Sequence, residues 1–391
     1  MIALARRAAY EVVRRVFAEE AYADRALVSA VAGLDDRDRA LAQRLAYGTV
    51  QRARTIDYGI EQLGKRPVRK LDAPVIASLR LGAYQLAWSD QAAHAVTDDA
   101  VELVRAAGLE RAVPFTNAVM RRLAHGFNGL VASLPDGPLK LSYPDWISDV
   151  WERDFGREEA LELMRAQNEA PALEVRAAEP VGEPTDVPGA YVVDRVDPAR
   201  MRAMSRASQL VALVVGSQEG ERILDGCAAP GGKTAMLAGD VTAVEVHPGR
   251  AEALARDSAP NVHVVIVDLR ELEDTGFDRA LVDAPCSGLG VLARRPDLRW
   301  RSRPLPELQL GLLRAAAERV RPGGTIVYSV CTMNADENEA VVDAVAGQLG
   351  LTFEALGEEW PRYAHPRRPE FLLTLPHRDR TAGFFVARLK S

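Results

Sequence analysis

Three apolar runs in the 391-residue chain each end on a cysteine, and the chain has no further cysteine. Cys227 closes the run in RILDGC, Cys286 follows DAP in DAPCSGLG, and Cys331 follows YSV in VYSVCT. A deprotonated thiol is a strong nucleophile, so the positions of the cysteines indicate where covalent catalysis can occur. The sequence therefore predicts that its thiol chemistry lies where strands end.

Two thiols beside one pyrimidine could perform a methylation that the free base resists. Carbon 5 of cytosine is a poor nucleophile, but a thiolate that adds to carbon 6 turns the ring into an enamine, which attacks an electrophilic methyl group. The sulfonium of S-adenosylmethionine carries such a methyl group. Asp283, three residues before Cys286, could stabilise the altered ring, and a second cysteine could assist release of the first. Geometry alone allows Cys286 and Cys331 to exchange these two roles.

Structural and redox roles compete with this chemistry. Free cysteine often packs as a small apolar side chain, which suits Cys227, inside a turn, better than Cys286 and Cys331, which precede polar or turn residues. A small, odd number of cysteines argues against a disulfide framework and favours a reducing cytoplasm, where structural disulfides are rare. Without a CxxC pair or a Cys/His cluster, we expect no metal site.

The stretch LDGCAAPGGKT (224–234) predicts a ligand-binding turn between a strand and a helix. A P-loop would need glycine at Cys227, whereas Gly226 stands one residue early, and Pro230 lacks the backbone N–H that a phosphate cradle uses. The G-x-G-x-x-G pattern of dinucleotide-binding turns is also missing. A cofactor without phosphates, such as S-adenosylmethionine, fits better. The expected cofactor turn comprises Cys227, Ala228, Ala229, Pro230, Gly231, Gly232 and Lys233.

Two acidic residues follow the next two candidate strands. Glu245 lies 20 residues after Asp225, where a carboxylate can accept hydrogen bonds from ribose hydroxyls. Asp268 ends the third candidate strand and could reach an adenine edge. A helix N-cap or a solvated strand end is the alternative for each of them. The pattern therefore favours a nucleoside-like ligand across three neighbouring strands.

The order of candidate elements places these residues at one edge of a sheet. Near-continuous apolar strands alternate with helices, as in RILDGC, VTAVEV, VHVVIVD, FDRALVDAP and GGTIVYSVCT. This alternation predicts an α/β fold with a mainly parallel, doubly wound, Rossmann-like sheet, whose ligands bind at the carboxyl ends of the strands. We expect a short helix over 232–239, and a hairpin-like ending from the strands LTFEAL and GFFVARLK.

The front of the chain has a different character. Residues 3–125 carry apolar residues at three- and four-residue spacing, which predicts an all-α region, and a Pro- and Gly-rich linker follows over 128–146. Residues 1–135 carry a net charge of +4 and the rest −10, a difference that either chance or an anionic partner such as nucleic acid explains. We expect three parts: 1–135, a linking α/β region over 140–214, and 215–391.

Nothing in the sequence predicts export or a membrane span. The first residues, MIALARRAAYEVVRR, contain arginines and no long apolar core, and the longest apolar stretch, around LVALVV, is far too short to cross a bilayer. We therefore expect a cytoplasmic protein that makes no membrane contact and acts as a monomer.

Four motifs together resemble those of the Sun/Fmu family of RNA cytosine-5 methyltransferases, namely DGCAAPGGKT, DAPCSGLG, RRPDLRW (294–300) and YSVCT. Their order and spacing match across 215–391, and the combination is far more specific than any single motif. The resemblance implies that Cys331 is the nucleophile and that Cys286 assists product release. It also implies that residues 227–233, Glu245, Asp268 and Asp283 line the cofactor and target site.

The front region is similar to NusB, a helical RNA-binding module, in LRLGAYQLAW, HAVTDDAVELV and FTNAVMRRL. A NusB-like module before a Sun-like domain implies an enzyme that methylates one unpaired or flipped-out cytosine in 16S ribosomal RNA. Another RNA, such as transfer RNA, is one alternative substrate. A non-catalytic RNA-binding or ribosome assembly factor is another alternative, although intact Cys331, Cys286 and Asp283 argue against it.

Two details of the sequence depart from the family pattern. The stretch between Lys233 and Glu245 is several residues shorter than usual in the family, and Glu245 stands where aspartate is common.

The segment 294–301 is expected to contact the RNA backbone and stack on a base, while Trp300 could instead anchor a core. The basic residues of this segment are Arg294, Arg295, Arg299 and Arg301.

Overall fold

The computed structural model describes residues 2–391 and contains two compact units. The first unit extends to Asn168 and also includes Leu292–Arg301. The second unit comprises Glu169–Val291 and Ser302–Ser391. The chain therefore leaves the second unit after the DAPC motif, contributes ten residues to the first unit, and then returns.

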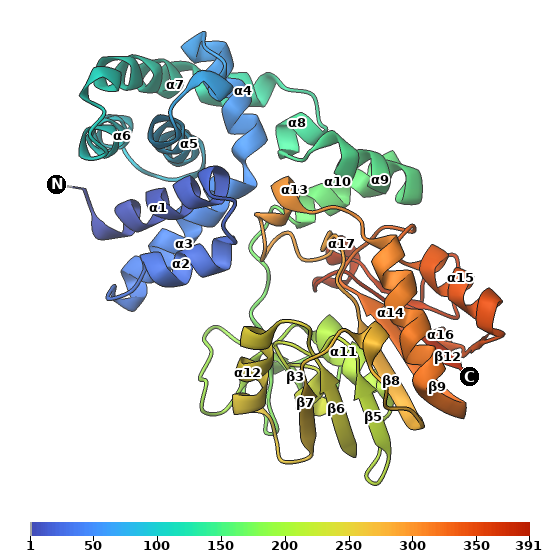
Figure 1. Cartoon of the computed structure of the whole chain (residues 1–391). Helices are drawn as coiled ribbons and strands as arrows, with labels where there is room; N and C mark the ends of the chain where they lie inside the picture. The colour runs from blue at the N-terminus through green and yellow to red at the C-terminus, as the bar shows by residue number, and fades with distance from the viewer. Residues whose placement is uncertain (1) are drawn as a thin grey trace. The chain divides into compact units, whose positions relative to one another are not determined.

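The first unit is all-helical, as the apolar spacing predicts (Figure 1). One core contains Val12, Val13 and Leu45, and another surrounds Met120 and Phe127. Its helices are α1 (Leu4–Ala18), α2 (Ala23–Ala30), α3 (Asp36–Gln51), α4 (Ala53–Gly64), α5 (Ala73–Trp88), α6 (Ala93–Ala106), α7 (Val113–Ser133), α8 (Pro138–Leu141), α9 (Asp145–Phe155), α10 (Arg157–Ala166) and α13 (Leu298–Arg301), with 3-10 turns at Val68–Lys70 and Glu110–Ala112.

Two local expectations for this unit were wrong. Helix α7 continues to Ser133, into the stretch predicted as a linker, and ends just before Pro135, whose ring disfavours helix at the preceding residue. The stretch SDVWERDFGREEALELMRAQ (148–167) suggests a single helix by its composition, but the helix begins earlier and is two helices, α9 and α10. They are separated by Gly156, whose φ of 85° suits glycine and interrupts the helix.

The basic segment at 294–301 was expected to contact RNA, and for Arg299 this is wrong. Arg299 is completely buried in the first unit, and its guanidinium donates to the carbonyl oxygens of Gln51, Ser142 and Gln167 at 2.9–3.3 Å. It also donates to the Tyr143 hydroxyl at 2.8 Å. Burial lowers the pKa of Arg299 to about 10, so it stays charged at neutral pH. Arg299 therefore saturates backbone acceptors from distant parts of the helical unit.

Trp300 lies in a hydrophobic core, which was the alternative to stacking on RNA. Its ring packs against the core that contains Val12 and Leu45, and its indole N–H donates to the Val50 carbonyl at 2.8 Å. Beside it, the guanidinium of Arg301 lies 3.8 Å from the centre of the Tyr22 ring. An indole whose N–H is already bonded to the protein is poorly placed to stack on RNA.

The second unit contains the expected doubly wound sheet, with strand order β10–β12–β9–β8–β5–β6–β7 and β11 paired to β12 (Figure 1). Strands β5 to β9 run parallel, and β10, β11 and β12 form the antiparallel ending. Their bounds are β5 (Arg222–Asp225), β6 (Asp240–Val244), β7 (Val262–Val265), β8 (Phe277–Asp283), β9 (Val320–Val330), β10 (Thr352–Phe353), β11 (Leu372–Thr374) and β12 (Phe384–Lys390).

Helices cover this sheet on both faces. The chain proceeds outward from β5 in both directions, so right-handed crossovers place α12 and α14 on opposite faces. The short helix expected over 232–239 is only a 3-10 turn, Thr234–Met236, because few residues separate the cofactor turn from β6. The helices are α11 (Arg206–Val215), α12 (Pro248–Asp257), α14 (Pro306–Arg319), α15 (Glu339–Leu349), α16 (Leu356–Glu359) and α17 (Pro376–Asp379), with 3-10 turns at Leu269–Glu271 and Pro361–Tyr363.

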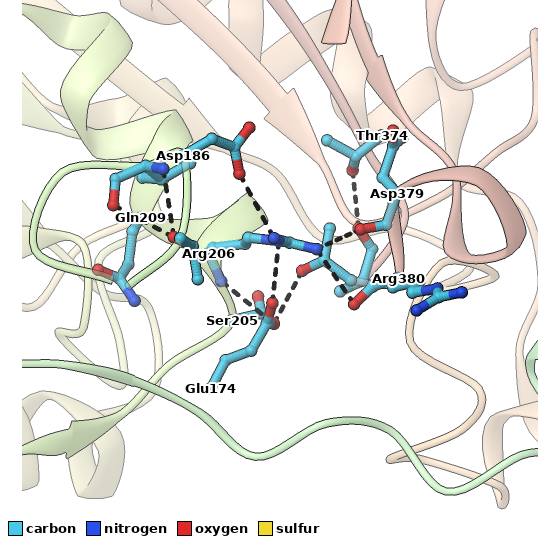
Figure 2. A network of polar contacts seen from close by, with 12 residues as sticks. Glu174, Asp186, Ser205, Arg206, Gln209, Thr374, Asp379 and Arg380 are labelled. Atoms are coloured by element: carbon cyan, nitrogen blue, oxygen red, sulfur yellow. Dashed lines mark hydrogen bonds and ion pairs between the residues drawn. The ribbon is translucent and has the colours of Figure 1, made fainter. Parts of the chain in front are cut away.

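A small antiparallel sheet precedes α11 in the second unit. Its strands, in the order β2–β3–β1–β4, are β1 (Glu174–Arg176), β2 (Glu183–Pro184), β3 (Ala190–Val192) and β4 (Arg202–Ala203). Figure 2 shows how half-buried Arg206 joins this sheet to the C-terminal segment. Its Nε lies 3.1 Å from a Glu174 oxygen, and Nη2 donates to the Asp379 carbonyl. Glu174 also accepts from the Thr381 hydroxyl at 2.8 Å, so one ion pair fixes residues distant in sequence.

No helix among residues 2–391 is long and apolar enough to cross a membrane. Over the same residues, no group of His, Cys, Asp and Glu side chains could hold a metal ion.

Candidate active site

The two cysteines predicted to work together lie beside each other in the second unit. Strands β8 and β9 are parallel neighbours, with Asp283 opposite Ser329, so the loops that follow both strands begin at the same edge of the sheet. Cys286 and Cys331 are partly buried in these loops, and their Sγ atoms are 3.4 Å apart. Because Gly290 N–H donates to the Cys331 carbonyl at 3.0 Å, the backbones of the two loops are also joined.

The surroundings of Cys286 keep its thiol protonated. Its hydrogen bond with Cys331, followed by burial, raises the pKa of Cys286 well above its usual value. The carboxylate of Glu337 adds to this rise. A thiol that holds its proton is poorly suited to begin a nucleophilic attack.

Asp283 is held by two partners at the end of β8. Its Oδ2 lies 2.6 Å from the Lys233 ammonium, and its Oδ1 accepts from the Ser329 hydroxyl at 2.9 Å. The ammonium also lies 4.9 Å from the centre of the Phe384 ring. The sequence predicted Asp283 and Lys233 separately, in the target site and in the cofactor turn. The structure joins them in one ion pair that links the two.

The predicted cofactor turn is hydrogen-bonded to two neighbouring strands. Gly226 N–H donates to the Leu281 carbonyl of β8 at 2.8 Å, and Ala228 N–H donates to the Val244 carbonyl of β6 at 3.0 Å. Gly231 has a φ of 92°, a conformation that favours glycine, and a Cβ there would lie 2.4 Å from the Leu254 side chain. Pro230 is exposed, Gly232 and Lys233 are half-buried, and Ala229 offers its carbonyl to Arg250 at 2.7 Å.

Burial raises the pKa of two titratable groups at the base of this turn. Asp225 is buried at the end of β5, where desolvation raises its pKa to about 6, while its Oδ2 accepts from the Thr234 hydroxyl at 2.7 Å. Its Oδ1 has no hydrogen-bond partner. Burial also raises the pKa of Cys227 far above its usual value. Cys227 is therefore an unreactive thiol, which fits the structural alternative.

The two predicted nucleoside-binding acids have different surroundings. Glu245 is buried beyond β6, accepts from the His247 N–H at 2.9 Å and lies 3.4 Å from the Arg250 guanidinium. Asp268 lies beyond β7 and caps the turn Leu269–Glu271, as its alternative assignment stated. Both of its oxygens accept from Arg270, which lowers the pKa of Asp268. Both carboxylates therefore already have protein partners, and Glu245 is the more deeply buried of the two.

Three features of this edge were missed in the sequence. Val246 and Ile266, beyond the ends of the paired strands β6 and β7, are 53% and 52% exposed, unusual for large apolar side chains. Glu337 is completely buried and accepts hydrogen bonds from the loop that follows Cys286. An apolar residue within two positions of an acid at each strand end could have signalled the two exposed side chains. The role of Glu337 depends on contacts between residues far apart in sequence.

Comparison with known proteins agrees with the two-part organisation. The family model described as 16S rRNA methyltransferase RsmB/F matches residues 212–390, and that of the NusB family matches residues 3–125. A probable ribosomal RNA small subunit methyltransferase B from Synechocystis is 32% identical, with 99% of each chain covered. Ribosomal RNA small subunit methyltransferase B from Thermus thermophilus is 35% identical, with 79% of this chain and 78% of the relative covered.

Solved structures show the same fold. The crystal structure of PH0851 superposes with a TM-score of 0.80 at 21% identity, covering 99% of this chain and 98% of that one. NSun6 from Pyrococcus horikoshii, solved with SFG, gives a TM-score of 0.53 at 21% identity and covers 63% of this chain and 98% of that one. The predicted fold class is confirmed, and the chain belongs to the RsmB/F family of ribosomal RNA small-subunit methyltransferases, with a NusB-family domain at its front.

Proposed function

We propose that this protein transfers a methyl group from S-adenosylmethionine to carbon 5 of a cytosine in 16S ribosomal RNA through a covalent cysteine–cytosine intermediate. The observation that carries this proposal is the pair of thiols, Cys286 and Cys331, 3.4 Å apart beside the Lys233–Asp283 ion pair. One pyrimidine ring can meet both sulfurs and the carboxylate at once. A methyltransferase that acted on an oxygen or an exocyclic nitrogen would need no such pair of thiols.

The residues of the chain divide the reaction between them. The Cys331 thiolate forms a bond to carbon 6, and the electron pair of the 5,6 double bond becomes available at carbon 5. The Lys233–Asp283 pair stabilises the charge that moves onto the ring. After the methyl group has arrived, carbon 5 loses its proton, the double bond reforms, and the bond from carbon 6 to sulfur breaks. Cys286, beside the departing sulfur, assists this elimination.

The residues beyond β5, β6 and β7 fit S-adenosylmethionine, whose sulfonium supplies the electrophilic methyl group when it is bound. Buried Glu245 suits ribose hydroxyls, and the exposed side chains of Val246 and Ile266 can cover the faces of a purine ring. The unpartnered Oδ1 of Asp225 offers an acceptor beneath the turn. The turn does not suit a triphosphate, because it has a proline where a phosphate cradle needs a backbone N–H.

The target cytosine has to be unpaired or flipped out of a helix, since both ring carbons must be open to the protein. The alternative substrate is another RNA, such as transfer RNA, and the relatives named for small-subunit ribosomal RNA favour 16S ribosomal RNA. Incubating the protein with S-adenosylmethionine and unmethylated 16S ribosomal RNA should create one site protected from bisulfite. Methyl transfer that leaves every cytosine sensitive to bisulfite would refute the carbon-5 assignment.

The cofactor turn leads to a prediction about ligand choice. The protein should bind S-adenosylmethionine and not ATP, because Cys227 and Pro230 break the spacing and the N–H pattern of a phosphate cradle. Isothermal titration calorimetry with each ligand measures this directly. ATP binding without an S-adenosylmethionine signal would contradict both the assignment of the turn and the proposed reaction.

A second prediction concerns the basic loop after α4. Lys65, Arg66, Arg69 and Lys70 lie on the surface of the first unit, which suits contact with RNA phosphates. Replacing all four with alanine should weaken RNA binding and make the dependence of log Kd on log salt shallower by about 0.7 for each phosphate that is no longer neutralised. Fluorescence anisotropy over a salt series checks this, with S-adenosylmethionine affinity as the control. An unchanged salt slope would assign the loop another role.

A further inference from the structure

A buried carboxylate lies behind the two thiols and belongs to none of the roles described so far. Glu337 stands between β9 and α15 and is completely buried. Burying a carboxylate without partners lowers the stability of the folded protein, so its surroundings must supply hydrogen bonds that replace those to water. The partners of Glu337 show which parts of the chain depend on it.

The donors to Glu337 come from three separate segments of the second unit. Oε1 accepts from the backbone N–H groups of Ser287 and Leu305 at 2.9 and 3.1 Å, and from Gln309 Nε2 at 3.0 Å. Oε2 accepts from the Ser287 hydroxyl and from Asn334 Nδ2, the latter at 3.2 Å. A site filled with donors suits an ionised carboxylate, which only accepts.

These segments are the ones that place the thiols. Ser287 directly follows Cys286, and its hydroxyl is also 2.8 Å from that of Thr332, which directly follows Cys331. Gln309 uses the same Nε2 to donate to the Pro285 carbonyl at 2.9 Å, just before Cys286. The Cys286 loop is thus held on both sides by groups that Glu337 organises.

We propose that Glu337 is a positioning residue, which fixes the loop of Cys286 against the loop of Cys331 and so sets the distance between the two thiols. It acts through Ser287 and Gln309 and touches neither sulfur by hydrogen bond. The carboxylate also holds Leu305, where the chain has re-entered the second unit after residues 292–301. This inference deepens the proposed function and rests on it for its meaning in catalysis, although the geometry itself can be tested without any reaction.

The distance between the thiols can be measured with phenylarsine oxide, whose arsenic(III) takes up two neighbouring thiols and releases water. Glu337→Ala in the full-length protein should weaken arsenical binding about 100-fold, because chelation by two linked thiols is lost. Cys331→Ala gives the level for a single-thiol site. Glu337→Gln keeps one acceptor oxygen for Ser287, Leu305 and Gln309, and should retain most of the affinity.

Methylation kinetics provide the second readout. Glu337→Ala should lower kcat about 100-fold through misplacement of the thiols while leaving the KM for RNA close to that of the parent protein. Glu337→Gln should restore much of kcat. The matched control is Glu339→Gln, which changes a neighbouring carboxylate that pairs with His365 at 2.6 Å and should leave arsenical affinity and kcat unchanged.

The outcomes separate this inference from the proposed function. Wild-type arsenical affinity in a folded Glu337→Ala protein would overturn the positioning role, whatever its activity. A weakened arsenical site in a protein that never methylates carbon 5 would keep the positioning role and refute the function. If Glu337→Ala does not fold, Ser287→Ala removes one link and keeps the carboxylate. It should weaken arsenical binding about tenfold, and unchanged binding there would also overturn the inference.

Discussion

Replacing Cys331 with alanine is expected to lower methylation by more than about a thousandfold and to leave no covalent protein–RNA species, because no thiolate remains in position to attack carbon 6. Replacing Cys286 is expected to retain the attack and impair release. The Cys286→Ala protein should accumulate a protein–RNA adduct that survives denaturing electrophoresis. The adduct should require S-adenosylmethionine if release stalls after methyl transfer.

A denaturing gel of each variant with labelled RNA measures both effects. Cys227→Ala is the matched control. This third thiol is half-buried at the base of the cofactor turn and its pKa is raised, so the thiol should form no stable adduct of its own. The assignment of the two roles rests on the family resemblance of the motifs DAPCSGLG and YSVCT, because the two adjacent thiols form one hydrogen-bonded pair. An adduct that accumulates in Cys331→Ala and is missing in Cys286→Ala would show that the roles are exchanged.

Asp283→Asn is expected to lower kcat about 100- to 10,000-fold, the usual range for losing a group that manages protons and charge at a reacting centre. Lys233 would keep its charge but lose the carboxylate that lies 2.6 Å from it. The charge that moves onto the cytosine ring would then meet an unpaired ammonium in an altered position. Single-turnover methylation at saturating RNA and cofactor isolates this effect from binding.

The control for this variant is Asp274→Asn, which removes another aspartate of the second unit that pairs with an arginine, Arg222, at 2.7 Å. Asp274 is exposed and precedes β8, at the opposite end of that strand from the thiols, so its loss should leave kcat unchanged. Equal activity of Asp283→Asn and the parent protein would remove Asp283 from the mechanism. A loss confined to cofactor affinity would make Asp283 a cofactor ligand only.

The sequence was most informative where an apolar strand ends on a residue that can do chemistry. In a doubly wound sheet, chain order nearly determines which strands are neighbours, so Cys286 and Cys331 could be placed together from the order of the strands alone. The same logic located Asp283 and the turn from Cys227 to Lys233. The periodicity of apolar residues was sufficient to predict the helices of the front region, because the apolar residues of each helix mark its buried face.

The sequence did not predict which polar side chains are buried and bonded inside the protein. Arg299 has the same guanidinium whether it faces a phosphate or backbone carbonyls, and its carbonyl partners at Ser142 and Gln167 are more than a hundred residues away in sequence. Glu337 reads as part of an acidic helix start, yet its donors include Ser287 and Gln309. Such roles depend on tertiary contacts, which local patterns do not record.

The ten residues from Leu292 to Arg301 also bear on how freely the helical front could be transplanted. A gene fragment that stops at Asn168 would encode the unit without Arg299 and Trp300, leaving the acceptors on Gln51, Ser142 and Gln167 without their buried donor. Unpaired buried acceptors cost about 1–3 kcal/mol each, a serious share of a domain's stability. Moving the helical front by simple fusion at Asn168 would therefore destabilise it, because ten of its residues are encoded within the sequence of the second unit.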